Sequence, residues 1–236
     1  MTGLVDAEDR GTISKTRIVA GQQQICRIDH ETKSDVPAGM MDRLIDVSKE
    51  LMKSNSIVVL SDYAKGILTD RFCHEIISFA RASGKPVIVD PKCKSFRKYL
   101  GCMVITPNVA EASVASGIEI NSEHSLRETG MALVEQLPGS NVLITRGPDG
   151  MALFEDGSEP ISIPTEARRV FDVIGAGDTV VATLAVALAG GLPLREAVGW
   201  ANVAAGIVVE KPGTATVSLE ELFSHRENSN LARRLE

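Results

Sequence analysis

The sequence predicts an α/β fold in which a largely parallel β-sheet is flanked by helices on both faces. The first observation is composition: 44% of the 236 residues are hydrophobic and 4% are aromatic, so aliphatic side chains typical of buried parallel strands dominate. The second is spacing, because short β-rich runs alternate with amphipathic segments of helix length. A chain of this length is expected to form one main domain.

The first elements differ from the rest of the chain. Residues 15–21 and 23–29 alternate between apolar and polar side chains as strands do, and no segment of helix length separates them. They predict a small antiparallel sheet ahead of the α/β core.

The β-rich runs that follow predict successive βα units. They lie at residues 57–60, 86–90, 102–106 and 141–145. Each run ends in polar or turn residues, and ligands of open α/β sheets bind beyond the carboxyl ends of the strands. The four loops after these runs are therefore candidate walls of a site.

The remaining elements complete the core. Residues 147–150, Gly-Pro-Asp-Gly, predict a hairpin turn between two apolar runs. The apolar stretch 180–189 predicts a buried helix, and residues 194–210 predict a second helix whose small residues permit close packing. A final short helix is expected from the cap residue Ser218 to about His225.

Charge and composition exclude several function classes. The formal charge is −6 and no cluster of Lys and Arg is long enough to follow a nucleic-acid backbone. The most apolar run is too short for a membrane crossing, and no leader-like segment stands at the N-terminus. The four cysteines form no C-x-x-C pair and the four histidines are scattered, so we expect reduced thiols in a cytoplasmic protein and no structural zinc.

A glycine-rich turn carries the clearest chemical signal. Gly175, Ala176, Gly177 and Asp178 stand directly before the apolar helix, where glycines let a ligand approach the backbone and the first helical amides attract anions. A dinucleotide fingerprint needs a third glycine where Val180 stands, and the chain has no Gly-Lys-Ser/Thr. An acid inside an anion site predicts a base that activates a hydroxyl beside a phosphate. The alternative is a tight turn with Asp178 capping the helix.

Residues 172–180, "DVIGAGDTV", resemble the C-terminal signature of the ribokinase-like sugar kinases, with Val173 in place of the usual threonine. "TPNVAE", "TRG" and "ANVAAG" resemble the nucleotide-side motifs of that family in the same order. The resemblance runs from about Thr12 to Ser218. It implies a ribokinase-like fold and phosphoryl transfer from ATP, with Mg²⁺, to a sugar hydroxyl.

Within that family, "QQQICRID", "VLSDYAKG" and "VDPK" are most similar to the members that phosphorylate D-glycero-D-manno-heptose 7-phosphate at its anomeric hydroxyl. Those members supply the inner-core lipopolysaccharide pathway. Two alternatives stay open: another sugar kinase of the same family, and an inactive nucleotide-binding remnant.

The resemblance also implies roles for single residues. Asp178 would be the general base, and Gly175 to Gly177 would form the anion hole. Residues implied on the nucleotide side are Lys92, Asn108, Glu111, Thr145, Arg146, Gly147 and Asn202. Glu111 would hold Mg²⁺ through water. Asn108 and Glu111 equally fit a helix cap with its first-turn acid, Asn202 fits a buried amide, and Lys92 and Arg146 fit exposed cations.

Further roles are implied, and for Arg27, Asp62 and Lys65 a solvated position without a site role is the alternative. Arg27, Asp62 and Lys65 would contact the sugar phosphate, and Asp172 and Gly213 would help to bind a monovalent cation such as K⁺.

Residues 1–50 would form a partial β lid and connection that acts as a clasp in a homodimer, and residues 51–236 the catalytic core. Family members normally begin with a further strand-rich third that carries much of the sugar-recognising surface. We therefore expect this chain to start within the lid and to leave central strands exposed.

Overall fold

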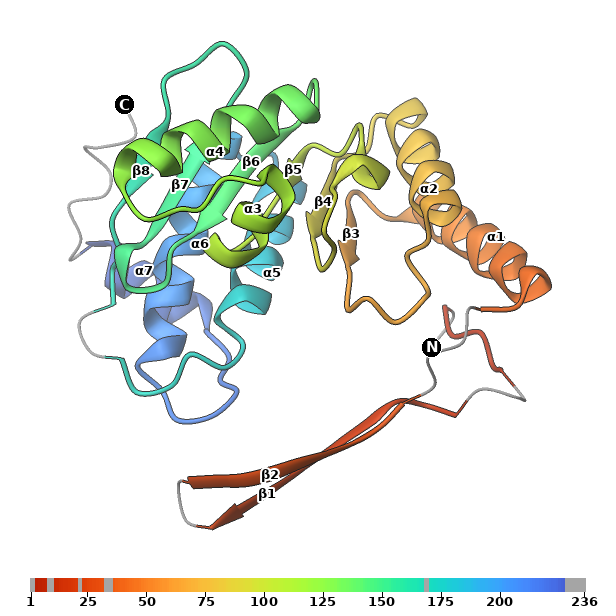
Figure 1. Ribbon diagram of the computed structural model, residues 1–236, viewed down its shortest axis with the longest axis horizontal. Helices are drawn as coiled ribbons and strands as arrows, with labels where there is room; N and C mark the ends of the chain where they lie inside the picture. Colours follow the sequence, from red (N-terminus) through yellow and green to blue (C-terminus); the bar gives the residue numbers. More distant parts are fainter. Residues whose placement is uncertain (1–2, 8–10, 21–22, 32–35, 168–169, 228–236) are drawn as a thin grey trace.

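The computed structural model describes residues 3–7, 11–20, 23–31, 36–167 and 170–227 (Figure 1). It shows an α/β core and a two-stranded hairpin that extends away from that core. The ribokinase-like α/β fold predicted from the sequence is confirmed, with a mostly parallel sheet between helices.

The hairpin consists of β1 (Ser14–Ala20) and β2 (Gln23–His30), which pair antiparallel as predicted. Directly opposed residues of such a pair point to the same face. One face is therefore uncharged and carries Thr16, Ile18, Cys26 and Ile28. The other is charged and carries Lys15, Arg17, Arg27 and Asp29.

The core sheet has six strands in the order β3-β4-β5-β6-β7-β8. The strands are β3 (Val58–Ser61), β4 (Val87–Asp90), β5 (Val104–Ile105), β6 (Asn141–Thr145), β7 (Met151–Phe154) and β8 (Ile161–Ile163). The first four run parallel, and β7 and β8 join them antiparallel. The turn predicted at residues 147–150 is present as a short 3₁₀ helix, η2 (Gly147–Asp149), between β6 and β7.

Helices cover both faces of the sheet (Figure 1). They are α1 (Ala38–Ser54), α2 (Asp70–Ala82), α3 (Val109–Ser116), α4 (Glu123–Gln136), α5 (Ala176–Ala189), α6 (Leu194–Val209) and α7 (Leu219–Glu227), with a 3₁₀ helix η1 (Arg97–Tyr99) after β4. Most buried apolar residues of α1 to α4 belong to one core cluster, and most of those of α5 and α6 belong to the other. No helix in these described ranges is long and apolar enough to cross a membrane.

Successive side chains of a strand point to opposite faces of the sheet, so neighbouring residues belong to different core clusters. Val87 and Val89 face the first cluster, while Ile88 between them faces the second. Because all three are fully buried, β4 reads as a continuous apolar run, as strands of a sheet covered on both faces do.

The expected domain boundary at residue 50 falls inside α1. Met41 and Ile45 on this helix belong to the first core cluster. The helix is therefore part of the α/β core, and the segment that stands apart from the core is the hairpin.

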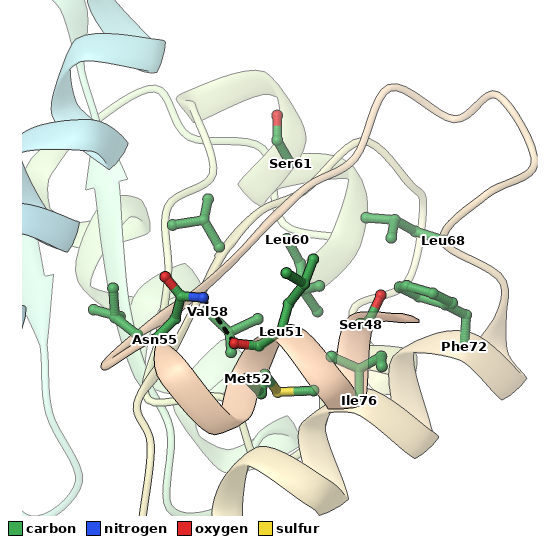
Figure 2. A pocket seen from close by; sticks show the side chains of 12 residues that line it. Ser48, Leu51, Met52, Asn55, Val58, Leu60, Ser61, Leu68, Phe72 and Ile76 are labelled. Carbon is green, nitrogen blue, oxygen red and sulfur yellow. Dashed lines mark hydrogen bonds between the residues drawn. The ribbon is translucent and has the colours of Figure 1, made fainter. Parts of the chain in front are cut away.

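Strand β3 lies at the edge of the sheet and, within the described residues, pairs with β4 alone. A groove of about 450 Å³ lies beside it, lined by residues of α1, β3 and α2. Figure 2 shows the side chains that line this groove. Apolar side chains line most of the groove, among them Leu51, Met52, Leu60 and Phe72. The sheet thus has an open edge with apolar surface next to it.

Candidate active site

The glycine-rich turn forms the N-terminus of α5. Gly175 adopts the left-handed conformation, with φ 80°, and is the N-cap residue. Its carbonyl oxygen accepts hydrogen bonds from the backbone N–H and the hydroxyl of Thr179, both at 2.9 Å. A non-glycine residue would be strained at this φ. The local sequence therefore folds as predicted, into a tight turn that opens a helix.

The amides of the first helical turn point out of the helix, and an anion would be favoured there. The N–H of Ala176 donates to the carbonyl oxygen of Val173 at 3.3 Å, a long hydrogen bond. Gly177 and Asp178 follow in the same turn, and both residues are exposed. Of the amides in the predicted anion hole, those of Gly177 and Asp178 are therefore the best placed to donate hydrogen bonds to a bound anion.

The turn separates two hollows. Ala176 and Gly177 line a cavity of about 380 Å³, whereas Gly175 and Asp178 line a groove of about 430 Å³ on the other side, against residues 214–222. A group bound in the cavity and a group bound in the groove would meet at the turn.

The cavity brings together several residues that the sequence predicts on the nucleotide side. Thr145, Gly147 and Asn202 all line it. Asn202 is 2% exposed, and its side-chain amide donates to the carbonyl oxygen of Pro164 at 2.8 Å. The lining is mostly apolar with a few fixed polar groups, as in small-molecule sites.

Asn108, Glu111 and Lys92 form one chain of contacts at the carboxyl ends of β4 and β5. Asn108 caps α3: its side-chain oxygen accepts from the Glu111 N–H at 2.9 Å, and Glu111 accepts from the Asn108 N–H at 3.0 Å. The Lys92 ammonium lies 2.8 Å from the same carboxylate, and this hydrogen bond raises the pKa of Lys92. Asn108 also bridges to Thr145, which links this group to the cavity.

Asp90, at the end of β4, is a site residue that sequence reasoning missed. Burial, together with the nearby carboxylates of Glu111 and Asp178, raises its pKa to about 6. Three acidic side chains therefore lie near one another at this edge of the sheet. They do not form a ready metal cage, since no group of three or more His, Cys, Asp or Glu side chains suited to a metal ion occurs among the described residues. The signal in the sequence is an acid as the last residue of a buried strand.

Asp62, directly after β3, is buried, and its carboxylate is hydrogen-bonded within the protein. It is 6% exposed. One oxygen accepts from the N–H of Ala64 at 2.7 Å, and the other accepts from Lys98 at 2.6 Å and from the hydroxyl of Tyr99 at 2.5 Å. Burial would raise the pKa of Asp62, but these three hydrogen bonds outweigh it and lower that pKa. Its predicted contact with a sugar phosphate stays a prediction, and the structure assigns it the task of anchoring the loop after β3.

The other predicted cations are paired. Lys65 forms an ion pair with Glu31, directly after β2, and Arg146 forms one with Glu123. Arg27 pairs with Asp29 at 2.7 Å on the hairpin, which lies apart from the core (Figure 1). None of these three side chains is brought into the 380 Å³ cavity, so their roles stay predictions.

Asp172 and Gly213 are in direct contact, and their predicted role in binding a monovalent cation stays a prediction. One oxygen of Asp172 accepts from the N–H of Ile174 at 2.9 Å, and the other accepts from the N–H of Gly213 at 3.2 Å. The carboxylate thereby joins the segment before α5 to the segment after α6.

Comparison with known proteins identifies the family of the chain. Residues 3–222 match the family described as pfkB family carbohydrate kinase. The chain is 43% identical over 241 residues to the bifunctional protein HldE of Geobacter sulfurreducens, covering 100% of this chain and 49% of that protein. It is 44% identical over 220 residues to HldE of Gluconobacter oxydans, covering 93% of this chain and 46% of that protein. The chain thus spans about half the length of the curated relatives it matches.

Solved structures share the fold. The Arabidopsis thaliana ribokinase complexed with ribose and ATP superposes with a TM-score of 0.74 at 22% identity, covering 94% of this chain and 71% of that one. The Escherichia coli phosphofructokinase-2 in complex with potassium gives 0.72 at 19% identity, covering 88% and 67%. With the family match over nearly the whole chain, the resemblance inferred from the sequence is confirmed: the chain belongs to the pfkB family of carbohydrate kinases.

Proposed function

We propose that this chain transfers a phosphoryl group from ATP to the anomeric hydroxyl of D-glycero-D-manno-heptose 7-phosphate, giving the 1,7-bisphosphate used for lipopolysaccharide inner-core precursors. The observation that supports the reaction type is the placement of Asp178, which lines the groove while its neighbours Ala176 and Gly177 line the nucleotide-side cavity. The choice of heptose rests on the HldE relatives and on the motifs that resemble heptose kinases.

In this proposal ATP lies along the cavity with its terminal phosphate at the first turn of α5. The amides of Gly177 and Asp178 stabilise the charge on the transferred group. Asp178 accepts the proton of the sugar hydroxyl. Because a carboxylate is a much weaker base than an alkoxide, the proton moves late and the electrostatic stabilisation of a loose transition state contributes most.

Magnesium fits the acidic group at the ends of β4 and β5. Glu111 and Asp90 lie close enough that Glu111 raises the pKa of Asp90, and a divalent cation would relieve this repulsion between carboxylates. Glu111 would hold the ion through water while Lys92 stays beside the phosphates. When bound, Mg²⁺ would neutralise charge on the ATP phosphates.

Two further features belong to the proposal. Asp172 and the segment around Gly213 would form part of a monovalent cation site next to the anion hole, with K⁺ as the first ion to try. The hairpin would join two copies of the chain.

Asp178→Asn tests the assigned chemistry. Removing the proton acceptor should lower kcat by about 10²–10⁴-fold, while the Kd for ATP stays within about threefold because Asp178 lines the groove and not the cavity. ADP release would be measured with Mg²⁺-ATP and heptose 7-phosphate, ribose, fructose or fructose 6-phosphate, and ATP binding by calorimetry. Asp46→Asn, an exposed acid on α1, is the matched control and should behave as the unsubstituted chain.

The turnover and ATP-binding measurements distinguish the proposed activity from its alternatives. Turnover that needs heptose 7-phosphate and is lost in Asp178→Asn supports the proposal. Turnover with ribose or a fructose phosphate instead would assign the chain to another sugar kinase of the family. ATP binding without turnover on any sugar would contradict the activity and leave a nucleotide-binding protein. Loss of ATP binding in Asp178→Asn would show that the acid serves the structure of the turn.

A further inference from the structure

The loop after β3 brings a tyrosine to the proposed base. The hydroxyl of Tyr63 lies 3.4 Å from one carboxylate oxygen of Asp178, although the two residues are 115 positions apart in the sequence. This distance is long for an O–H···O hydrogen bond, and catalytic hydrogen bonds are often long before substrate binds. The Tyr63 side chain is 60% exposed, so core packing does not explain its position.

The backbone of this loop is held in a costly conformation. Ala64 has φ 53°, the one positive φ found at a non-glycine residue in the described chain. Such a conformation costs an L-residue about 1 kcal/mol or more and persists only where surrounding contacts enforce it. Here the N–H of Ala64 donates to Asp62 at 2.7 Å.

The anchor of the loop is itself buried and fixed. The second carboxylate oxygen of Asp62 accepts from Lys98 and Tyr99, and Lys98 also donates to the carbonyl oxygen of Leu68 at 2.8 Å. The Asp62–Lys98–Tyr99 cluster therefore holds the loop against the protein interior. Tyr63, the next residue in the loop, is exposed, and its hydroxyl lies near Asp178 on α5. A rigid support of this kind is what a group needs to orient another group.

We propose that Tyr63 is a positioning residue for Asp178. Its phenol donates to one carboxylate oxygen and leaves the other oxygen directed at the sugar hydroxyl. This inference rests on the proposed function, because it assigns Tyr63 a task in the same phosphoryl transfer. The Asp62–Lys98–Tyr99 cluster serves that task through the backbone.

Tyr63→Phe tests the task, since it removes the hydroxyl and keeps the ring. We expect kcat to fall about tenfold, the effect of losing one hydrogen bond to a charged group, with the KM for ATP unchanged within about threefold. Tyr63→Leu is the comparison: a similar fall shows that the hydroxyl carries the effect. Full activity in Tyr63→Phe together with loss in Tyr63→Leu would assign the ring a covering role and overturn the proposal.

A second measurement tests the contact without turnover. The chain has two tyrosines, so tyrosine labelled with ¹³C at the ring carbon ζ gives two NMR signals, assigned by Tyr63→Phe. Asp178→Ala should shift the Tyr63 signal and leave that of Tyr99, whose hydroxyl is bonded to Asp62. Asp46→Ala, on the outer face of α1, should move neither. A Tyr63 signal that does not move in Asp178→Ala would overturn the proposal.

The two proposals fail in different ways. Absence of turnover in the unsubstituted chain with every sugar contradicts the proposed function, and with it the positioning task. Normal turnover in the unsubstituted chain with equal kcat in Tyr63→Phe contradicts the task of Tyr63 alone.

Discussion

Two aspartates at neighbouring strand ends show how surroundings decide the chemistry of a residue. Asp62 follows β3 and Asp90 ends β4, and the N–H of Asp62 donates to the carbonyl oxygen of Asp90 at 2.9 Å. Three hydrogen bonds lower the pKa of Asp62 despite its burial. Burial and the carboxylates of Glu111 and Asp178 raise the pKa of Asp90 to about 6. The first aspartate is therefore a fixed anion, and the second titrates near neutral pH.

Asp90→Asn should change how stability depends on pH. The pKa of Asp90 is about 6 in the folded chain and about 3.9 in an unfolded one, so the folded state binds the proton more tightly. Stability from this group is greatest below pH 4, falls as pH rises toward 6, and stays lower above it. Asn carries no charge, so we expect Asp90→Asn to raise the Tm at pH 8 by about 2–4 °C, with solvent screening of this partly exposed group limiting the gain.

Thermal unfolding without nucleotide or divalent cation, at pH 4 and pH 8, measures this difference. The Tm gain should be much smaller at pH 4, where Asp90 is protonated in the folded state and about half protonated in the unfolded state. A gain of equal size at both pH values would show that packing, and not the charge of Asp90, is responsible.

At the scale of elements, the pattern of apolar residues within a segment predicts most strands and helices of the core well. The strand at residues 141–145 and the helix beginning at Leu194 appear where predicted. β5 is shorter than the predicted run 102–106, but the N–H groups of Met103 and Thr106 still donate to β4 carbonyl oxygens. The difference is therefore one of strand boundary.

Site residues, too, are predictable from the sequence where their signal lies within one continuous segment. Asp178 was found because Gly-Ala-Gly-Asp is a continuous motif at a helix start. Tyr63 and Asp90 were not found, because their significance depends on residues distant in the sequence that only the fold brings near. Asn108 and Glu111 make the capping box that their spacing also predicted, so sequence alone could not separate the two interpretations.

Gly150, in the turn between β6 and β7, should tolerate no side chain. Its φ and ψ of 81° and −128° lie in a region used almost only by glycine. A Cβ there would lie 2.1 Å from the carbonyl oxygen of Ile163, and backbone cannot move aside as a flexible side chain can. We expect Gly150→Ala to reduce the free energy of unfolding by about 3–5 kcal/mol, the sum of conformational strain and overpacking.

Gly157→Ala is the matched control for this turn. Gly157 also has a positive φ, 67°, but nothing lies within 4 Å of a Cβ built there. It should therefore lose about 1 kcal/mol, from backbone strain alone. Urea unfolding of both variants measures the difference, and equal losses would refute the clash with β8. Because Gly150 lines the 380 Å³ cavity, ATP binding should weaken in Gly150→Ala as well.

At the scale of the whole molecule, packing against the core does not explain how the hairpin of β1 and β2 is stabilised. A two-stranded hairpin alone is marginally stable in water, yet every side chain described in β1 is exposed. Ile18 and Ile28, on the uncharged face, are 43% and 57% exposed. Local alternation predicted the two strands, but alternation cannot say what covers their apolar face. A second copy of the chain, with its own hairpin laid face to face on the first, would bury it.

Substituting the uncharged face tests that arrangement. We expect the unsubstituted chain to sediment as a dimer and the double variant Ile18→Glu, Ile28→Glu to sediment as a monomer, because two carboxylates on each hairpin would have to lose their hydration at the interface. Arg17→Ser is the control: Arg17 stands opposite Arg27 on the charged face, so its removal should leave the dimer intact. Sedimentation velocity over a range of concentrations distinguishes the species. A dimer that persists in the double variant would move the interface away from the hairpin, toward the open edge of β3 and the apolar groove beside it.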